Sequence, residues 1–125
     1  TDTHMKVIAT GGLVRANSLE AVGPMSEHAF QVITVGTAVL GADGMSAEIG
    51  ATTYDEAEAR TAIAMASNAQ RVVVAVDGSK IGNVTLAKMV APPQIHHLVT
   101  DSTADRDQLD RIAAAGVQVH VVDVE

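Results

Sequence analysis

Four short segments of the sequence combine glycine with polar residues that could bind a small ligand. Glycine lets backbone N–H groups come close to an oxyanion, aspartate accepts hydrogen bonds from sugar hydroxyls, and Lys80 offers a positive charge to a phosphate. These residues indicate binding of a polar, partly anionic small molecule such as a phosphorylated sugar. The same composition would also be expected if each segment only formed a turn. The segments are Thr10-Gly11-Gly12, Gly41-Ala42-Asp43-Gly44, Asp77-Gly78-Ser79-Lys80 and Thr100-Asp101-Ser102.

Other kinds of site are not supported by the sequence. The chain has no cysteine, which excludes disulfides, thiolate metal ligands and a cysteine nucleophile. His96 and His97 are adjacent, so on a strand they would point to opposite faces and make a poor metal pair. His4, His28 and His120 show no partner pattern, and no dinucleotide-binding or P-loop motif occurs. We therefore expect no metal, no cofactor and no catalytic residue.

The segments that must position these residues alternate between β-branched runs and alanine-rich stretches, which is typical of an α/β domain. We expect helices from Pro24 to about Val32, over about Tyr54–Ala69, and from Ser102-x-x-Asp105 to a left-handed cap at Gly116. In open α/β sheets, ligands bind beyond the carboxyl ends of the strands. The expected strands are Lys6–Ala9, Ala38–Gly41, Arg71–Val76, Val84–Val90, Ile95–Thr100 and a final one around Val117–Val121.

Two patterns predict how these elements pack. Thr53-x-x-Glu56 matches a capping box for the second helix, and the face of that helix is nearly all alanine, so it should lie close against a sheet. Arg71–Val76 is apolar almost throughout, which indicates a parallel strand covered on both faces. Val117, Val119 and Val121 alternate with polar residues, which indicates a half-buried strand near a sheet edge. The expected fold is α/β, with a mostly parallel sheet flanked by helices.

Composition limits the functions that this chain could have. Its 125 residues suit one domain, and 47% of them are hydrophobic, so a packed core is expected. The net charge is −7, and the eight basic residues are scattered singly, so the chain alone is a poor match for nucleic acid. No apolar run is long enough to span a bilayer, and the first residues lack the apolar region of a signal peptide. We expect a cytoplasmic protein with no membrane partner.

The ordered series of motifs resembles the C-terminal sensor domain of DeoR-family transcriptional regulators, over about Lys6 to Asp123. No single motif is specific for this family, but the order in which the motifs follow one another is. The motifs are Ile8-Ala9-Thr10-Gly11-Gly12, Val22-Gly23-Pro24, Leu40-Gly41-Ala42-Asp43-Gly44-Met45, Gly50-x-Thr52, Glu58-Ala59, Arg71-Val72-Val73-Val74, Asp77-x-Ser79-Lys80 and Leu98-Val99-Thr100-Asp101.

The resemblance implies a fold similar to ribose-5-phosphate isomerase and CoA transferases. It also implies a repressor of sugar catabolism with an N-terminal helix-turn-helix domain that binds operator DNA. The effector would be a phosphorylated sugar or sugar acid, and the protein a homodimer or homotetramer. Lys80 is the strongest single candidate for ligand contact, and Glu58 has a rival role at the start of its helix. Five residues match the family's recurrent polar positions, and with two loop glycines they form the candidate ligand-binding set: Gly11, Gly12, Asp43, Glu58, Asp77, Lys80 and Asp101.

The sequence also departs from the family's pattern. The Ser-Gly-Thr-Thr-type loop that cradles phosphate in the family is missing, and so is the DNA-binding domain. We therefore expect residues 6–125 to be a partial sensor domain, and residues 1–5 to be a tag remnant or a disordered start. Gly36 stands where the family often has aspartate, so the choice of ligand could differ. An incomplete sheet would leave an unpaired edge that another copy could complete.

Two alternatives to a sensor stay open. A phosphosugar isomerase would need a positioned general base. The isomerases resembled here carry an acidic residue where Gly44 stands, and they carry a Lys-Gly-Gly-Gly loop that this sequence lacks. The other alternative is an oligomerisation fragment without a competent site, which the missing phosphate loop favours. Sensing needs only that a ligand bind two states of the protein unequally.

Overall fold

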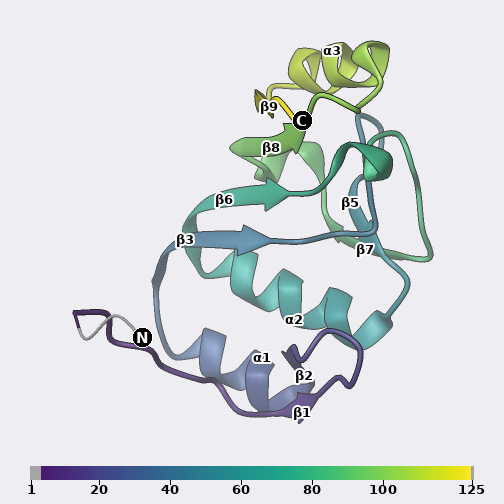
Figure 1. The fold of residues 1–125 in the computed structure, drawn as a ribbon. Helices are drawn as coiled ribbons and strands as arrows, with labels where there is room; N and C mark the ends of the chain where they lie inside the picture. The colour runs from purple at the N-terminus through teal and green to yellow at the C-terminus, as the bar shows by residue number, and fades with distance from the viewer. Residues whose placement is uncertain (1–3, 125) are drawn as a thin grey trace.

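A computed structural model describes residues 4–124 of the chain, which form an α/β fold. A parallel sheet has the strand order β3-β6-β8-β9 (Figure 1). Strands β3, β6 and β8 run in one direction and end at the same edge of the sheet, which is the arrangement that the sequence predicted. The strands are β3 (Val35–Leu40), β6 (Ala69–Ala75), β8 (His97–Asp101) and β9 (Gln118–Val122).

Two smaller sheets lie beside the parallel one. A hairpin pairs β1 (Leu13–Val14) with β2 (Ala21–Val22). A three-stranded antiparallel sheet has the order β4-β5-β7. The sequence reading missed β4 and β5, because these strands are short and contain glycine and small polar residues rather than β-branched runs. Their bounds are β4 (Gly44–Ser46), β5 (Gly50–Thr53) and β7 (Ala87–Val90).

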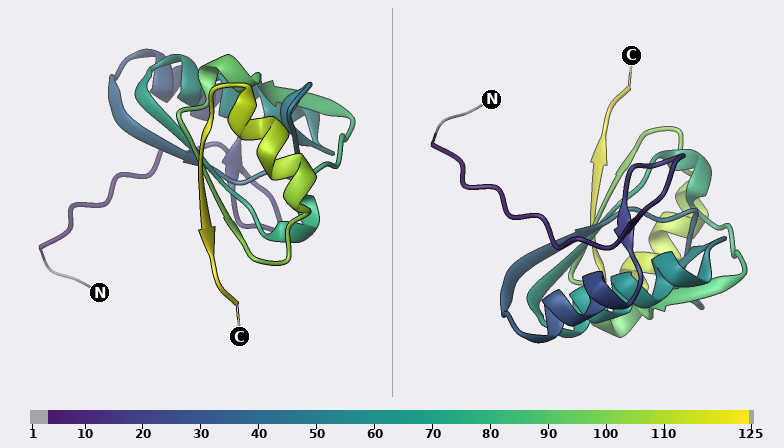
Figure 2. Two further views of the ribbon diagram at one scale, coloured as in Figure 1. Left: turned by 90° about the horizontal axis from the view of Figure 1, so that it is seen from above. Right: turned by 90° about the horizontal axis from the view of Figure 1, so that it is seen from below.

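The three α-helices lie on one side of the parallel sheet (Figure 2). Helix α1 (Pro24–Gln31) packs on α2 (Glu56–Ser67), and α2 contacts both β3 and β6. Helix α3 (Arg106–Ala114) follows β8. Two short 3-10 helices, η1 (Gly78–Lys80) and η2 (Pro92–Gln94), follow β6 and β7.

One face of the sheet is buried and the other is not. Val72 and Val74 of β6 are buried, whereas Val73 between them is only half-buried and Val39 on β3 is 62% exposed. The prediction that Arg71–Val76 is covered on both faces is therefore wrong, because the helices in the described part of the chain pack on the other face.

Two local predictions for the first half of the chain are also wrong. Lys6–Ala9 forms no strand: these residues pair with no neighbour in the described structure, and the side chain of Ile8 is 81% exposed. Helix α2 is capped by Asp55 rather than Thr53, because the Asp55 side chain accepts a hydrogen bond from the Glu58 N–H at 2.9 Å. Thr53 instead ends β5 and is fully buried.

The second half of the chain follows the sequence reading more closely. The helical spacing after Asp105 predicts a buried stripe of Leu109, Ile112 and Ala113; α3 buries the first two but leaves Ala113 exposed. Gly116 has the left-handed φ of +101° expected after a helix. Strand β9 lies at the edge of the sheet as predicted, but it is less buried than its alternating pattern indicated, since Val121 is 50% exposed. Within the described residues no helix is long and apolar enough to cross a membrane. Of residues 1–5, which the sequence reading set apart from the domain, the first three lie outside the described structure.

Candidate functional site

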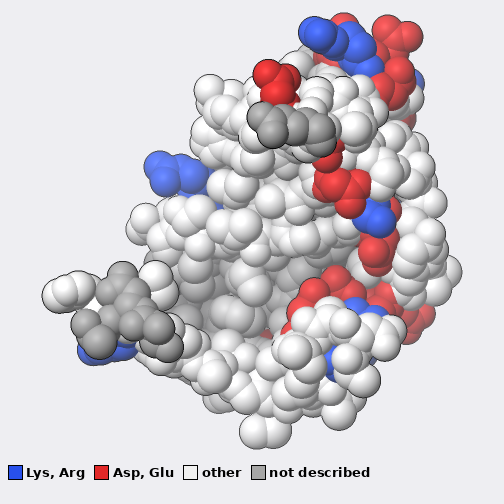
Figure 3. Space-filling view, in the orientation of Figure 1, with Lys and Arg blue, Asp and Glu red and all other residues white. Residues whose placement is uncertain are grey.

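Polar residues follow the carboxyl ends of β3, β6 and β8. Asp43 lies three residues after β3, Asp77 two residues after β6, and Asp101 is the last residue of β8. Because the three strands are parallel neighbours, their polar residues lie along one edge of the sheet. Figure 3 shows charged side chains gathered along the right-hand side of the molecule, towards which β3 and β6 run in Figure 1. This edge is where ligands bind in open α/β sheets.

Asp43 and Glu58 are joined through the hydroxyl group of Thr53. The Thr53 oxygen lies 2.9 Å from Oδ2 of Asp43 and 3.1 Å from Oε2 of Glu58. Since a hydroxyl carries one hydrogen, Thr53 donates to one carboxylate at a time. The backbone N–H of Tyr54 makes a further bond to Oδ2 of Asp43, at 3.2 Å. The antiparallel pairing of β4 with β5 and the start of α2 thus bring together two carboxylates that are 15 positions apart in the sequence.

Arg15 supplies the positive charge of this cluster. Its guanidinium forms an ion pair with Glu58, and its Nε lies 3.5 Å from Oδ2 of Asp55. Asp55 also caps α2 through the Glu58 N–H, and its pKa is lowered, chiefly by that backbone hydrogen bond. Arg15 belongs to the segment between β1 and β2, so this hairpin loop is held against the first turn of α2.

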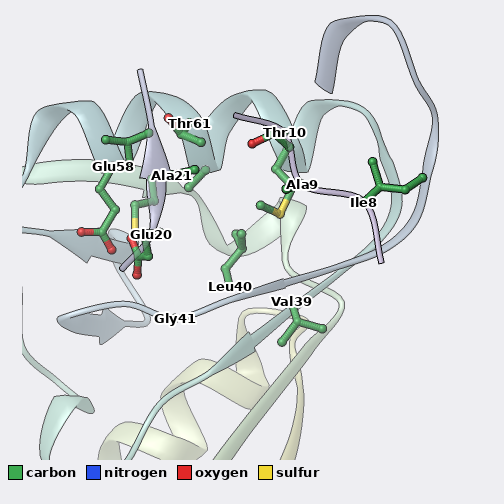
Figure 4. Close-up of a pocket in the computed structure, with 14 residues that line it drawn as sticks. Ile8, Ala9, Thr10, Glu20, Ala21, Val39, Leu40, Gly41, Glu58 and Thr61 are labelled. Atoms are coloured by element: carbon green, nitrogen blue, oxygen red, sulfur yellow. The ribbon is translucent and has the colours of Figure 1, made fainter. Parts of the chain in front are cut away.

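Glu20, at the other end of the same loop, adds a further carboxylate. Its pKa is raised, first by loss of hydration and then by the negative charge of Glu58, while Arg15 opposes the shift. Figure 4 shows the side chains of Glu20 and Glu58 on the same side of the pocket, with Glu58 projecting from α2. A hydrogen-bond donor directed at the Glu20 carboxylate would stabilise its charged form and oppose this shift.

A pocket of about 390 Å³ adjoins these two glutamates. Apolar side chains line its floor, and polar groups are few, which is the usual character of small-molecule sites. In Figure 4, Leu40 points towards the helix side of β3, whereas Val39 points to the opposite face. The lining comes from the N-terminal segment, β2, the end of β3, α2 and β7, and it includes Thr10, Glu20, Leu40, Glu58, Thr61 and Met89.

Asp77 and Asp101 form a second group in which the carboxylates shape the turns. Asp101 accepts hydrogen bonds from the N–H groups of Gly78 at 2.9 Å and Thr103 at 2.8 Å. Asp77 accepts one from the N–H of Ser79 at 2.9 Å. Hydrogen bonds lower the pKa of both aspartates, with the side chain of Ser79 as the largest cause at Asp77 and that of Thr103 at Asp101. These carboxylates fix the loops that follow β6 and β8.

Lys80 ends the 3-10 helix η1 and is half-buried. It makes no salt bridge with any of residues 4–124. Its charge contributes to the lowered pKa of Asp77, after the hydrogen bonds from Ser79. Lys80 is therefore a cation whose charge no carboxylate within ion-pair distance neutralises in the described part of the chain.

Gly11 and Gly12 serve packing in this structure. The carbonyl of Gly11 accepts a hydrogen bond from the hydroxyl of buried Ser26. Gly12 has a φ of +120°, and a Cβ there would lie 2.7 Å from the carbonyl oxygen of Val22. The segment Thr10-Gly11-Gly12 does not leave a strand, contrary to the sequence reading, since no strand precedes it.

The predicted residues thus fall into separate groups. Asp43 and Glu58 lie together, Asp77 and Asp101 meet around Gly78, and the pocket lining includes Glu58 but none of the other six. Arg15 and Glu20 were missed because no local pattern marks them, and only the hairpin brings them to α2. The motif Thr53-x-x-Glu56 predicts a cap at Thr53, but Asp55-x-x-Glu58 also offers a capping aspartate with an acidic residue three positions later.

A parallel sheet with polar groups at its carboxyl edge and a pocket beside them defines an α/β domain of the class that binds small molecules beyond its strand ends. Residues 1–102 match the family model of the DeoR C-terminal sensor domain, so the chain belongs to that family. The sequence resemblance, and the α/β fold that it implied, are confirmed.

The chain is similar to several transcriptional regulators. It is 33% identical over 118 residues to the HTH-type transcriptional regulator GlpR of Haloferax volcanii, covering 94% of this chain and 46% of that protein. It is 30% identical over 118 residues to a putative aga operon transcriptional repressor of Escherichia coli O157:H7, covering 94% and 44%. The HTH-type transcriptional regulator GolR of Listeria innocua is 24% identical over 120 residues, covering 96% and 47%.

These comparisons bear on the choice between sensor and enzyme. The chain spans about half the length of the relatives that it matches. The family is a sensor domain, and these relatives are transcriptional regulators or repressors rather than enzymes. The isomerase alternative therefore gains no support, and the expectation of an effector-sensing domain is confirmed at this level.

Proposed function

We propose that this chain binds a phosphorylated sugar or sugar acid and serves as the effector-binding and oligomerisation part of a DeoR-family repressor. The observation that carries the proposal is the pair of carboxylates that line the pocket, Glu20 and Glu58, where burial and then the charge of Glu58 raise the pKa of Glu20. A sugar hydroxyl can donate a hydrogen bond, and an ionised carboxylate can only accept one. A polyol that donated to Glu20 and Glu58 would therefore relieve their mutual repulsion.

The anionic end of such a ligand needs a cation. Arg15 is already neutralised by Glu58 and Asp55, whereas Lys80 has no carboxylate within ion-pair distance in the described structure. Lys80 is the proposed partner of a phosphate or acid group, with Asp43 supporting the hydroxyl contacts through Thr53. Asp77, Asp101, Gly11 and Gly12 act indirectly in this proposal, because they hold the loops that place these side chains.

Ligand binding would act on DNA through the arrangement of subunits. The outer edge of β3 pairs with no strand in the described structure, and an open edge invites pairing with another chain. In the proposed mechanism, copies associate through this domain, and the ligand changes the spacing of helix-turn-helix domains that lie outside this chain. Coupling is reciprocal, so a ligand that weakens operator binding is itself weakened by operator DNA to the same degree.

A thermal-shift screen tests the binding proposal. The 125-residue chain is heated with a panel of sugar phosphates, sugar acids and matched free sugars. A ligand at 100 times its Kd should add about 2.7 kcal/mol to the free energy of unfolding. Lys80→Ala should abolish the shift caused by phosphorylated ligands, and Glu58→Gln should reduce it for every ligand. Lys88→Ala is the matched control, since Lys88 is an exposed lysine on β7.

Two results would count against the proposal. If no compound in the panel shifted the midpoint, the chain would be an oligomerisation fragment without a competent site. If a ligand shifted the midpoint equally in the parent, in Lys80→Ala and in Glu58→Gln, the ligand would bind elsewhere. Sedimentation velocity on the same protein measures association separately, so failure of ligand binding and failure of oligomerisation can be told apart.

A further inference from the structure

Two histidines meet on the face of the parallel sheet that the helices leave uncovered. His97 lies on β8 and His120 on β9, and the register places His120 opposite Val99, so the two are diagonal neighbours on one face. Nδ1 of His97 lies 3.0 Å from Nε2 of His120. The ring centroids are 5.2 Å apart, and the ring planes are tilted by 36°. His97 is half-buried and His120 is exposed.

This separation fits two ligands of one metal ion. Imidazole nitrogens bind Zn²⁺ at about 2.0–2.1 Å. Two such nitrogens in neighbouring positions around an ion lie about 2.9 Å apart at a right angle and about 3.4 Å apart at a tetrahedral angle. We propose that His97 and His120 together bind a divalent transition-metal ion through Nδ1 and Nε2, at a site separate from the sugar pocket. Imidazole suits Cu²⁺, Ni²⁺ and Zn²⁺, and Cu²⁺ should bind most tightly of the three.

The change from hydrogen bond to metal site is small. In the hydrogen-bonded pair one nitrogen holds the proton that lies between the rings. In the metal-bound form both rings are neutral, with their protons on Nε2 of His97 and Nδ1 of His120, and both facing lone pairs are given to the metal. The rings turn about their Cβ–Cγ bonds so that the lone pairs converge. Exposure of His120 leaves room for this rotation.

The neighbouring groups define the rest of the site. Gln118 lies directly opposite His97 and shares its face. Arg71 lies on the same face of β6, two residues before Val73, which pairs with His97, and its positive charge opposes a bound cation. Asp101 shares the face as well, but its carboxylate already accepts two backbone N–H groups. No cluster of three or more His, Asp or Glu side chains suited to a metal occurs among residues 4–124, so water fills the remaining positions.

His96 shows why adjacency in sequence is not the signal here. Its Nδ1 accepts a hydrogen bond from the Val72 N–H at 3.0 Å, so that nitrogen is used by the backbone. Because His96 and His97 are adjacent, the sequence predicts that they make a poor metal pair. The partner of His97 lies instead on the next strand, and only the register of β8 and β9 identifies it.

Titration with CuCl₂ and with NiCl₂ tests the site. Calorimetry is carried out in a buffer that does not coordinate metal, in a His4→Gln background that removes the imidazole near the N-terminus. We expect one ion per chain. Loss of an outer-shell partner alone typically weakens metal binding 10–100-fold, so His97→Gln and His120→Gln should each weaken it by at least about tenfold. His28→Gln is the matched control, as an exposed histidine on α1, and should bind as the background does.

The same titration followed by amide NMR gives a second readout that needs no substitution at His97 or His120. Cu²⁺ is paramagnetic, and it should broaden the signals of residues 96–99 and 118–121 first.

Arg71→Gln should strengthen metal binding in the calorimetric titration, because it removes a cation from the same face. Unchanged affinity in both His97→Gln and His120→Gln, or broadening centred on other residues, would overturn the proposal.

Discussion

The hydroxyl of Thr53 can be removed without changing the size of the side chain, which makes Thr53→Val the sharpest test of the carboxylate cluster. Thr53 is fully buried, and its oxygen lies within hydrogen-bond distance of Asp43 and Glu58. Valine keeps the shape but cannot donate. Asp43 would retain the Tyr54 N–H, and Glu58 would retain Arg15, but the donor between the carboxylates would be lost.

The size of the effect follows from the charge of the acceptors. A hydrogen bond to a charged group contributes about 1.5–3 kcal/mol, so we expect Thr53→Val to lower the free energy of unfolding by about 2 kcal/mol. Unfolding entropy is roughly 2.1 cal/mol/K per residue, so a chain of 125 residues loses about 4 °C of Tm per kcal/mol. The expected fall in Tm is therefore about 8 °C.

Urea titration monitored by circular dichroism measures this change, and Thr37→Val is its matched control. Thr37 is an exposed threonine on β3, so its change should stay within about 0.5 kcal/mol. A double-mutant cycle with Glu58→Gln should give a coupling energy above about 0.5 kcal/mol. Additive effects, or a loss at Thr53 no larger than that at Thr37, would refute the argument that this hydroxyl links the two carboxylates.

Three further outcomes are expected. Gly78→Ala places a Cβ 2.4 Å from the backbone nitrogen of Ala104, and it should lower the free energy of unfolding, measured by urea titration, by about 1–3 kcal/mol. Its control is Gly36→Ala, whose Cβ meets nothing within 4 Å and which should raise that free energy by about 0.5–1 kcal/mol. Asp101 has a folded-state pKa below its ordinary value of 3.8. Its contribution to the free energy of unfolding is therefore present above pH 3.8 and is lost as the pH falls through the lowered pKa. Asp101→Asn should make the free energy of unfolding depend less on pH in this acidic range. Glu20 has the opposite sign, since its pKa lies above 4.5 and the folded state loses stability as pH rises. Glu20→Gln should therefore gain more, relative to the parent, at pH 7 than at pH 4, and equal gains at both would contradict the shift.

The elements that the sequence predicted correctly are those with strong periodic or apolar patterns. The alanine face of α2 is buried at Ala59, Ala62 and Ala66, as the helical spacing indicated. The valines of β6 identified a strand, but their number suggested cover on both faces. The apolar content of a strand does not show whether other elements cover both faces of its sheet. Val73 is only half-buried because the described helices cover the opposite face.

The failures have physical reasons as well. Lys6–Ala9 has the composition of a strand, but a strand exists only when another chain segment supplies hydrogen-bond partners, and the described structure supplies none there. The cluster around Glu58 depends on Arg15, which is 43 positions away, and no local spacing reports such a contact. Sequence spacing can indicate which residues lie at the ends of strands. It does not show which of their carboxylates accept hydrogen bonds from backbone N–H groups.

That last distinction bears on which carboxylates we propose for ligand contact, because a carboxylate oxygen already bonded to the backbone has less capacity for a new donor. Asp101 accepts two backbone N–H groups and Asp77 accepts one, and these bonds lower both pKa values. A sugar hydroxyl that displaced such a bond would leave a backbone N–H unpaired, at a cost of about 1–3 kcal/mol if it were buried. The pKa of Glu20 is shifted in the opposite direction, because its charged form is disfavoured, and a new hydrogen-bond donor would stabilise that form. The proposed hydroxyl contacts therefore centre on Glu20 and Glu58, whereas the sequence placed Asp77 and Asp101 in the candidate set beside Glu58 and did not indicate Glu20.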